Sequence, residues 1–122
     1  MASPTQRSLK HLREQGWTAC VVEKWIPQIK RRKDVFGFGD LLAIRVWDMT
    51  LNGEHTDLTV KREIALVQTT SLNNMAARRD KIMAIPEAAY WKRSGGMILL
   101  HGWAKRGPRG QRKTWQVKEE IL

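Results

Sequence analysis

The chain has 122 residues, of which 42% are hydrophobic and 28% are charged, and this balance predicts one folded domain over 1–122 rather than a disordered chain. Its 22 lysines and arginines outnumber its 12 acidic residues, giving a formal net charge of +10. Such an excess attracts polyanions, so we expect nucleic acid as the partner. A basic surface that serves solubility alone is the alternative.

The sequence carries no signal for a membrane or for an oxidising compartment. No apolar run approaches the roughly 18 residues that cross a bilayer, and residues 1–8 lack the apolar core of a signal peptide. The single cysteine, Cys20, cannot form an intramolecular disulfide and is expected to be a small core residue of a strand. We therefore expect a cytoplasmic protein without a membrane partner.

The N-terminal segment predicts a helix followed by a strand. Ser3, Pro4 and Gln6 form the pattern of a helix start, with a hydroxyl cap, a proline in the first turn and an amide three residues after the cap. Gly16 is well placed to end this helix. Residues 17–29 are expected to form one kinked strand that ends, or bulges at a sheet edge, near Pro27.

Two apolar segments rich in β-forming residues predict the second and third strands, at 41–46 and 63–69. Between them, Asn52 and Gly53 are typical of a tight turn, in which His55 is interpreted as a loop histidine. The remaining elements are expected to be a helix ending at 85, a short helix at 87–93, a buried strand at 97–103, a basic loop at 105–113 and a last strand at 114–117. This order predicts an α/β fold with a mixed central sheet flanked by helices.

Acidic and amide side chains mark the candidate active site. Asp34 and Asp40 lie at the two ends of a short loop, which Gly37 and Gly39 make easy to bend. Gln68 interrupts the apolar third strand, and a polar amide there is costly to bury without a partner. Two neighbouring strands that each deliver an oxygen ligand are a common way to hold a hard divalent cation. Asp40 and Gln68 are therefore the first candidates for a metal site.

An acid, a short loop, a strand, a turn and a strand with a polar pair at alternate positions resemble the PD-(D/E)XK nuclease superfamily, which includes archaeal Holliday-junction resolvases and many restriction and phage nucleases. The segments KDVFGFGDLLAI (33–44), ALVQTTS (65–71) and NNMAARRDKI (73–82) are similar to small nuclease-like proteins of phages and prophages. The resemblance spans about 8–122. It implies a restriction-endonuclease-like α-β-β-β-α-β core with an extra C-terminal hairpin strand.

The resemblance also implies an activity, which is metal-dependent hydrolysis of DNA phosphodiester bonds, with branched or junction DNA among the expected substrates. Asp40 matches the metal-binding acid of the superfamily, and the carbonyl of Thr69 matches a further ligand to Mg²⁺ or Mn²⁺. Gln68 stands at the position of a second acid, and Thr70 at that of the lysine. Resolvases of this kind act as two-fold dimers, so a homodimer in the cytoplasm of a phage host is implied.

The departures at Gln68 and Thr70 leave alternatives open. A neutral amide would hold Mg²⁺ more weakly, and a threonine cannot supply an ammonium group to the scissile phosphate. Glu23 and Asp34 are expected as compensating acids, with Lys33, Arg78 or Lys81 as displaced cations. Otherwise the chain is a catalytically inactive nuclease fold that binds nucleic acid, or an interaction protein that uses the fold as a scaffold.

Clusters of cations are the candidate nucleic-acid contacts. One run leads directly into Asp34, a second group lies on the helix after Gln68, and a third fills the last loop. The six tryptophans are interpreted mainly as core residues, and stacking of exposed bases on Trp91 or Trp103 is the alternative. The histidines and the cysteine lack zinc-ligand spacing, and no P-loop is present. The expected nucleic-acid-binding residues are Lys30, Arg31, Arg32, Lys33, Arg78, Lys81, Lys105, Arg106, Arg109, Arg112 and Lys113.

Overall fold

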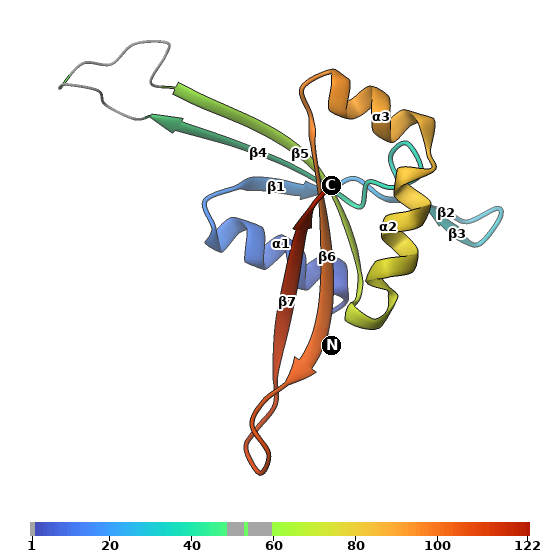
Figure 1. Cartoon of the computed structure of the whole chain (residues 1–122). Coiled ribbons are helices and arrows are strands. Elements are labelled where there is room, and N and C mark those ends of the chain that lie inside the picture. The colour runs from blue at the N-terminus through green and yellow to red at the C-terminus, as the bar shows by residue number, and fades with distance from the viewer. Residues whose placement is uncertain (1, 49–52, 54–59) are drawn as a thin grey trace.

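A five-stranded mixed sheet forms the centre of the computed structural model, which describes residues 2–48, 53 and 60–122 (Figure 1). The order of its strands is β1-β4-β5-β6-β7. Strands β5 and β6 are parallel, and the other neighbours are antiparallel. The strands are β1 (Thr18–Val21), β4 (Leu41–Asp48), β5 (Val60–Ser71), β6 (Met97–Arg106) and β7 (Thr114–Ile121). The expected α/β architecture is thus confirmed at the level of a mixed central sheet.

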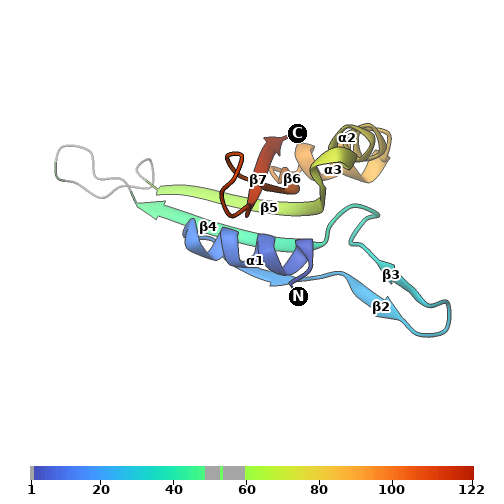
Figure 2. The same ribbon diagram turned by 90° about the horizontal axis from the view of Figure 1, so that it is seen from below.

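Helices cover both faces of the sheet, as the sequence predicts (Figure 2). The parallel pair β5–β6 needs a crossover, which is built from η2 (Leu72–Asn74), α2 (Met75–Met83) and α3 (Pro86–Arg93) on one face. On the other face lies α1 (Pro4–Glu14), whose first turn is capped where Ser3 Oγ accepts a hydrogen bond of 3.2 Å from the Gln6 N–H. Gly16 follows the helix with a φ of +88°, the left-handed conformation that ends helices.

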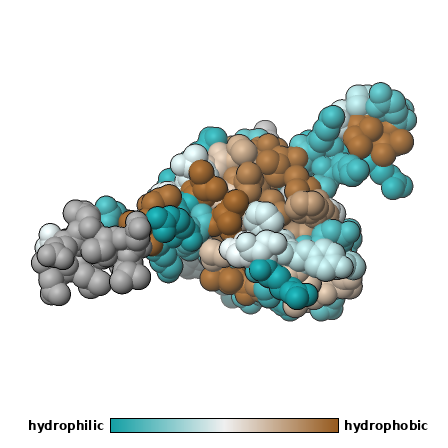
Figure 3. Space-filling model, turned by 90° about the horizontal axis from the view of Figure 1, so that it is seen from above, coloured by the Kyte–Doolittle hydropathy of each residue, from teal (hydrophilic) through white to brown (hydrophobic). Residues whose placement is uncertain are grey.

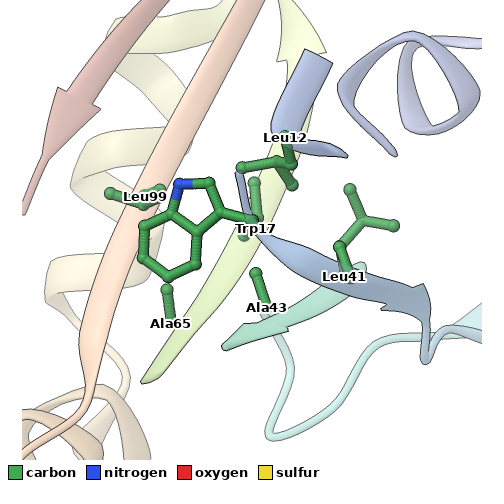
Figure 4. Packing of buried hydrophobic residues seen from close by; sticks show 8 residues of the cluster. Leu12, Trp17, Leu41, Ala43, Ala65 and Leu99 are labelled. Carbon is green, nitrogen blue, oxygen red and sulfur yellow. The ribbon is translucent and has the colours of Figure 1, made fainter. Parts of the chain in front are cut away.

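Each face of the sheet has its own hydrophobic core. Between α1 and the sheet, the indole of Trp17 lies among small and branched side chains that include Ala43, Ala65 and Leu99 (Figure 4). On the other face, Leu66 of β5 packs with side chains from α2, α3 and β6. Because successive residues of a strand point to opposite faces, the central strand β5 is apolar on both sides.

The N-terminal strand prediction is wrong in one respect: residues 17–29 do not form a single strand. After β1, the N–H groups of Val22 and Glu23 both donate to the Asp40 carbonyl, and the chain leaves the sheet. It then forms β2 (Lys24–Ile26), which pairs with β3 (Arg31–Lys33) in a separate two-stranded hairpin. This β2–β3 hairpin projects from the body of the molecule (Figures 1 and 2).

Cys20 is exposed, which contradicts the expectation of a core residue. Alternation along β1 directs Ala19 into the core beneath α1 and turns Cys20 to the opposite face. On that same face, Ile44 and Val46 of β4 are also exposed. Hydrophobic side chains accordingly gather on the surface of the body between the grey segment and the hairpin (Figure 3).

Several boundaries differ from the prediction while the elements remain. The helix expected to end at 85 is divided into η2 and α2 and stops at Met83, and both C-terminal strands are longer than predicted. The interpretation of His55 lies outside the described residues. Within the described part of the chain, no helix is long and apolar enough to cross a membrane.

Candidate active site

Three carboxylates from three segments of the chain meet at one end of the sheet. Glu23 precedes β2, Asp34 follows β3, and Asp40 precedes β4. One carboxylate oxygen of each residue lies within 4.8 Å of those of the other two. Because Lys24 pairs with Lys33 at the base of the β2–β3 hairpin, Glu23 and Asp34 are held next to each other. The hairpin that the sequence did not predict therefore builds two thirds of this cluster.

A tight loop places Asp40 beside Asp34. Val35 and Gly39 exchange backbone hydrogen bonds of 2.9 and 2.8 Å, and Gly37 takes a φ of +84° between them. Phe38 is fully buried and anchors the loop in the core. A Cβ at Gly39 would lie 2.9 Å from Leu66 Cδ2 and 3.2 Å from Val35 Cβ, so close packing favours glycine there. The expected glycine-dependent bend between the two acids is present.

Asp40 is buried, with 4% of its surface exposed, and is oriented by donors from β5. Its Oδ2 accepts hydrogen bonds from Gln68 Nε2 at 2.7 Å, from the Thr69 N–H at 2.8 Å and from Thr69 Oγ1 at 3.2 Å. Burial raises the pKa of Asp40 to about 8, and the neighbouring carboxylates of Asp34 and Glu23 act in the same direction. The Thr69 N–H opposes this rise. The site therefore favours the protonated, neutral form of Asp40.

Thr69 connects this cluster to the first helix. Its hydroxyl has one proton, which it donates to Asp40, so it accepts from Thr5 Oγ1 at 3.1 Å. Both threonines are buried. The first turn of α1 is thereby fixed against the end of β5, next to the three carboxylates.

An open groove with a volume of about 470 Å³ runs over the carboxylates and is here called the acid groove. Gln68 and Thr69 line it beside the three acids, and Ser3, Pro4 and Thr5 contribute the first turn of α1. Three predicted cations also line it: Arg32 from β3, and Arg78 and Lys81 from α2. Arg32 pairs with Glu23 at 2.6 Å, and a two-pronged pair from Arg79 to Glu120 ties α2 to β7.

Thr70, which stands at the position of the superfamily's lysine in the sequence, does not line the acid groove. It is buried and pairs with Gly102 of β6. A Cβ at Gly102 would lie 2.2 Å from Met75 Sδ, so this stretch of the sheet packs tightly under η2 and α2. The cations that do line the groove come from α2 and β3.

The remaining cations that were predicted to contact nucleic acid lie on two projections of the molecule. Lys30, Arg31 and Lys33 are exposed on the β2–β3 hairpin, and the basic loop between β6 and β7 forms the other projection (Figure 1). Trp103 is a core residue, as the main interpretation of the tryptophans expects: its indole is buried and donates to Ser8 Oγ at 2.8 Å. Trp91 is half-buried, with its indole N–H bonded to the Met97 carbonyl.

Sequence reasoning missed a second polar cluster, which joins α1 to the C-terminal strands through the buried Ser8 and His101 and the exposed Glu119. His101 Nδ1 lies 2.9 Å from Ser8 Oγ, and His101 Nε2 lies 2.8 Å from Glu119 Oε2. The one signal in the sequence is a histidine within the apolar run of β6, since a buried polar group requires partners. Its partners are 93 and 18 residues away, so their identity could not be inferred locally.

Comparisons of the chain with models of known protein families, with curated proteins and with solved structures find no match.

Proposed function

We propose that the chain is a metal-dependent nuclease that hydrolyses phosphodiester bonds of nucleic acid in the acid groove. The observation that carries the proposal is the meeting of Glu23, Asp34 and Asp40, with carboxylate oxygens within 4.8 Å of one another. Cations line the same groove. Carboxylates to hold a metal ion and cations to hold a polyanion are the two requirements of phosphodiester hydrolysis.

The donor set fits a hard divalent cation. Mg²⁺ and Mn²⁺ prefer carboxylate and carbonyl oxygens, and Asp40 with Asp34 and Glu23 provides the carboxylates. The side-chain carbonyl of Gln68 and the backbone carbonyl of Thr69 are further candidate ligands. The raised pKa of Asp40 supports this fit, because a cation would relieve the cost of keeping that buried carboxylate ionised. A bound ion would lower the pKa of a water molecule and neutralise charge on the phosphate.

The other side chains of the groove would orient the carboxylate of Asp40 and hold the phosphates of the substrate. Gln68 and Thr69 donate to one oxygen of Asp40 and fix the direction of that carboxylate. Arg78 and Lys81 lie on α2 along the groove, where they would bind phosphate oxygens and take the role that lysine has in the superfamily. We assign no catalytic role to Thr70, because it does not line the groove.

The topology supports the family assignment. Helix α1, the antiparallel series β1-β4-β5, the helical crossover and the parallel strand β6 follow the order α-β-β-β-α-β that the superfamily core has. The β2–β3 hairpin is an insertion before β4, and β7 is the additional C-terminal strand. On this basis we extend the proposal to DNA, with junctions among its substrates, to a two-fold dimer and to the cytoplasm of a phage host.

One observation favours the alternative of a fold that binds nucleic acid without cutting it. Two of the three carboxylates already have protein partners, since Gln68 donates to Asp40 and Arg32 pairs with Glu23. If these contacts replace the metal, the groove is a basic surface that binds nucleic acid, and its carboxylates are satisfied by protein side chains.

The deciding experiment is cleavage of labelled duplex, single-stranded and four-way-junction DNA with Mg²⁺ or Mn²⁺. Wild type is compared with Asp40→Asn and with Asp80→Asn, an exposed aspartate of α2 outside the groove that serves as the matched control. The nuclease proposal expects cleavage by wild type and by the control variant and none by Asp40→Asn. DNA binding without cleavage by any of the three proteins would establish the alternative.

A further inference from the structure

A second hollow lies on the other side of α1, between that helix and the hairpin of β6 and β7. Its volume is about 390 Å³, and Arg7, Lys10 and His11 of α1 face Trp103 and Trp115 across it. Trp115 also lines a neighbouring hollow of about 600 Å³, together with Lys105, Arg112 and Lys113. We call these two hollows, which share Trp115, the tryptophan groove.

Trp115 combines an exposed aromatic face with cations. Its side chain is 44% exposed, and the Arg7 guanidinium carbon lies 3.6 Å from the centre of its ring. Lys105, its partner in the β6–β7 register, has Nζ at 5.9 Å from the same centre. Among the residues that line the groove, the acid is Glu14, and it pairs with Lys10 at 3.9 Å. The groove therefore attracts anions that also carry a planar group.

Consecutive residues at the start of α1 line the two grooves. Pro4 and Thr5 line the acid groove, whereas Gln6 and Arg7, the next residues of the same helix, line the tryptophan groove. A strand of nucleic acid that passes from the acid groove over the start of α1 would meet Arg7, which lies over the ring of Trp115.

We propose that the tryptophan groove binds a single-stranded segment of nucleic acid, with one base stacked on Trp115 and the flanking phosphates held by Arg7, Lys105 and the loop cations. The base takes the place of the Arg7 guanidinium on the indole ring. A duplex cannot make this contact because its bases already stack on one another, whereas an unpaired base offers a free face. The inference rests on the proposed function, since it names the form of the nucleic acid that the nuclease would act on: a substrate with an unpaired strand.

Trp47 provides a matched control. It is also 44% exposed, and the Arg45 guanidinium lies 4.3 Å from the centre of its ring. However, Arg45 pairs with Glu63 at 3.2 Å, and the same carboxylate accepts the Trp47 indole N–H. Trp47 therefore has the same exposure and the same kind of cation contact, but its surroundings are neutralised.

The test is fluorescence anisotropy of a labelled oligothymidylate of about 12 nucleotides, within the range of known single-strand site sizes, in EDTA so that no cleavage occurs. Trp115→Leu should weaken binding by about tenfold, which is the order of one base–aromatic stack. Trp115→Tyr should restore most of the binding, and Trp47→Leu should leave it unchanged. Affinity for a duplex of equal length should change less than about twofold in Trp115→Leu, as expected for phosphate contacts that remain intact.

Three results would overturn the inference. These are unchanged single-strand binding by Trp115→Leu, an equal loss for single strand and duplex, and equally tight, Trp115-dependent binding of polyglutamate. Thermal melting of each variant separates a lost contact from a lost fold, and rescue by Trp115→Tyr separates stacking from general packing.

The two proposals fail in different assays. Single-strand binding is read in EDTA, whereas the nuclease is read by cleavage of duplex and junction DNA with Mg²⁺. Trp115-dependent binding without any cleavage would leave the tryptophan groove established and the nuclease refuted. Asp40-dependent cleavage without Trp115-dependent binding would establish the nuclease and refute single-strand binding in the tryptophan groove.

Discussion

Two polar clusters join α1 to the sheet, and they differ in the environment of their carboxylates. In the first, Thr5 contacts Thr69 beside Asp40; in the second, Ser8 contacts His101. A hydrogen bond from His101 lowers the pKa of Glu119, whereas burial raises the pKa of Asp40. The second cluster thus favours an ionised carboxylate, whose side chain is 40% exposed, and the first favours a protonated, buried one.

The difference shows that residue types alone do not define a site. Ser8, His101 and Glu119 have the hydrogen-bond order of a nucleophile, a base and an orienting acid. Ser8 and His101 are nevertheless fully buried, and Ser8 Oγ also accepts the Trp103 indole N–H. A substrate could not reach Ser8 without unfolding of α1. Access to a groove and an unbalanced charge are what make the Asp40 cluster the functional candidate.

The largest expected effect is the loss of cleavage when the carboxylate of the first cluster is removed. Asp40→Asn should reduce cleavage by more than about a hundredfold, because even residues that only orient a metal ligand contribute about 10–100-fold. The same variant should leave the melting temperature of the metal-free protein unchanged or higher, since it removes a carboxylate from a crowded, buried position. Cleavage kinetics and thermal melting in EDTA check the two parts. Retained cleavage would assign the groove another role.

Gln68 tests the orienting role within the first cluster. Gln68→Leu removes the 2.7 Å hydrogen bond to Asp40 and should reduce cleavage and Mn²⁺ affinity by about 10–100-fold. Gln68→Glu adds a carboxylate and should instead raise Mn²⁺ affinity while it destabilises the metal-free protein. Titration calorimetry with Mn²⁺ measures both. Equal Mn²⁺ affinities for wild type and both variants would place Gln68 outside the metal site.

Ser8 tests the structural role of the second cluster. Ser8→Ala leaves the Trp103 N–H and one His101 nitrogen without their buried partner, so it should lower the free energy of unfolding by about 1–3 kcal/mol. Cleavage at a temperature where the variant is folded should match that of wild type. Urea denaturation measures the first quantity. Loss of cleavage by a fully folded variant would show that this cluster acts in the reaction.

The pH dependence of stability tests the environment of Asp40 directly. An unfolded aspartate loses its proton near pH 4, while folded Asp40 keeps it to about pH 8. Between these values the unfolded state binds fewer protons, so stability falls as pH rises, by at most about 1.4 kcal/mol per pH unit. The contribution is complete below pH 4 and lost above pH 8. Urea denaturation across this range should show the slope in wild type and a flatter profile in Asp40→Asn.

Saturating Mg²⁺ provides the second part of this measurement. If the ion binds at Asp40 it takes the place of the proton, and the slope of wild type should flatten to that of Asp40→Asn. An equal slope with and without Mg²⁺ would contradict a metal site at this carboxylate.

Apolar patterns predicted the part of the site that belongs to the sheet. The apolar runs at 41–46 and 63–69 identified β4 and β5 as neighbours, and this was enough to bring Asp40 to Gln68. The glycines of the intervening loop indicated how Asp34 could approach the same point. These inferences hold because long apolar strands are specified by their own residues.

The rest of the site depends on contacts that no local pattern shows. β2 and β3 have three residues each and are rich in lysine and arginine, so the segment is typical of a solvated loop. The position of Glu23 could therefore be proposed only as compensation for a missing acid. The spacing from Gln68 assigns Thr70 to the position of the lysine. In the structure Thr70 pairs with Gly102, where Met75 packs closely against the sheet.

The position of the β2–β3 hairpin has a thermodynamic consequence. The hairpin that displays Lys30, Arg31 and Lys33 is flanked directly by Glu23 and Asp34, so displacement of its base changes the spacing of two carboxylates. A polyanion bound along the hairpin and a cation bound between the carboxylates would then share one mechanical element. Such linkage is reciprocal: whatever factor the cation adds to the affinity for the polyanion, the polyanion adds to the affinity for the cation.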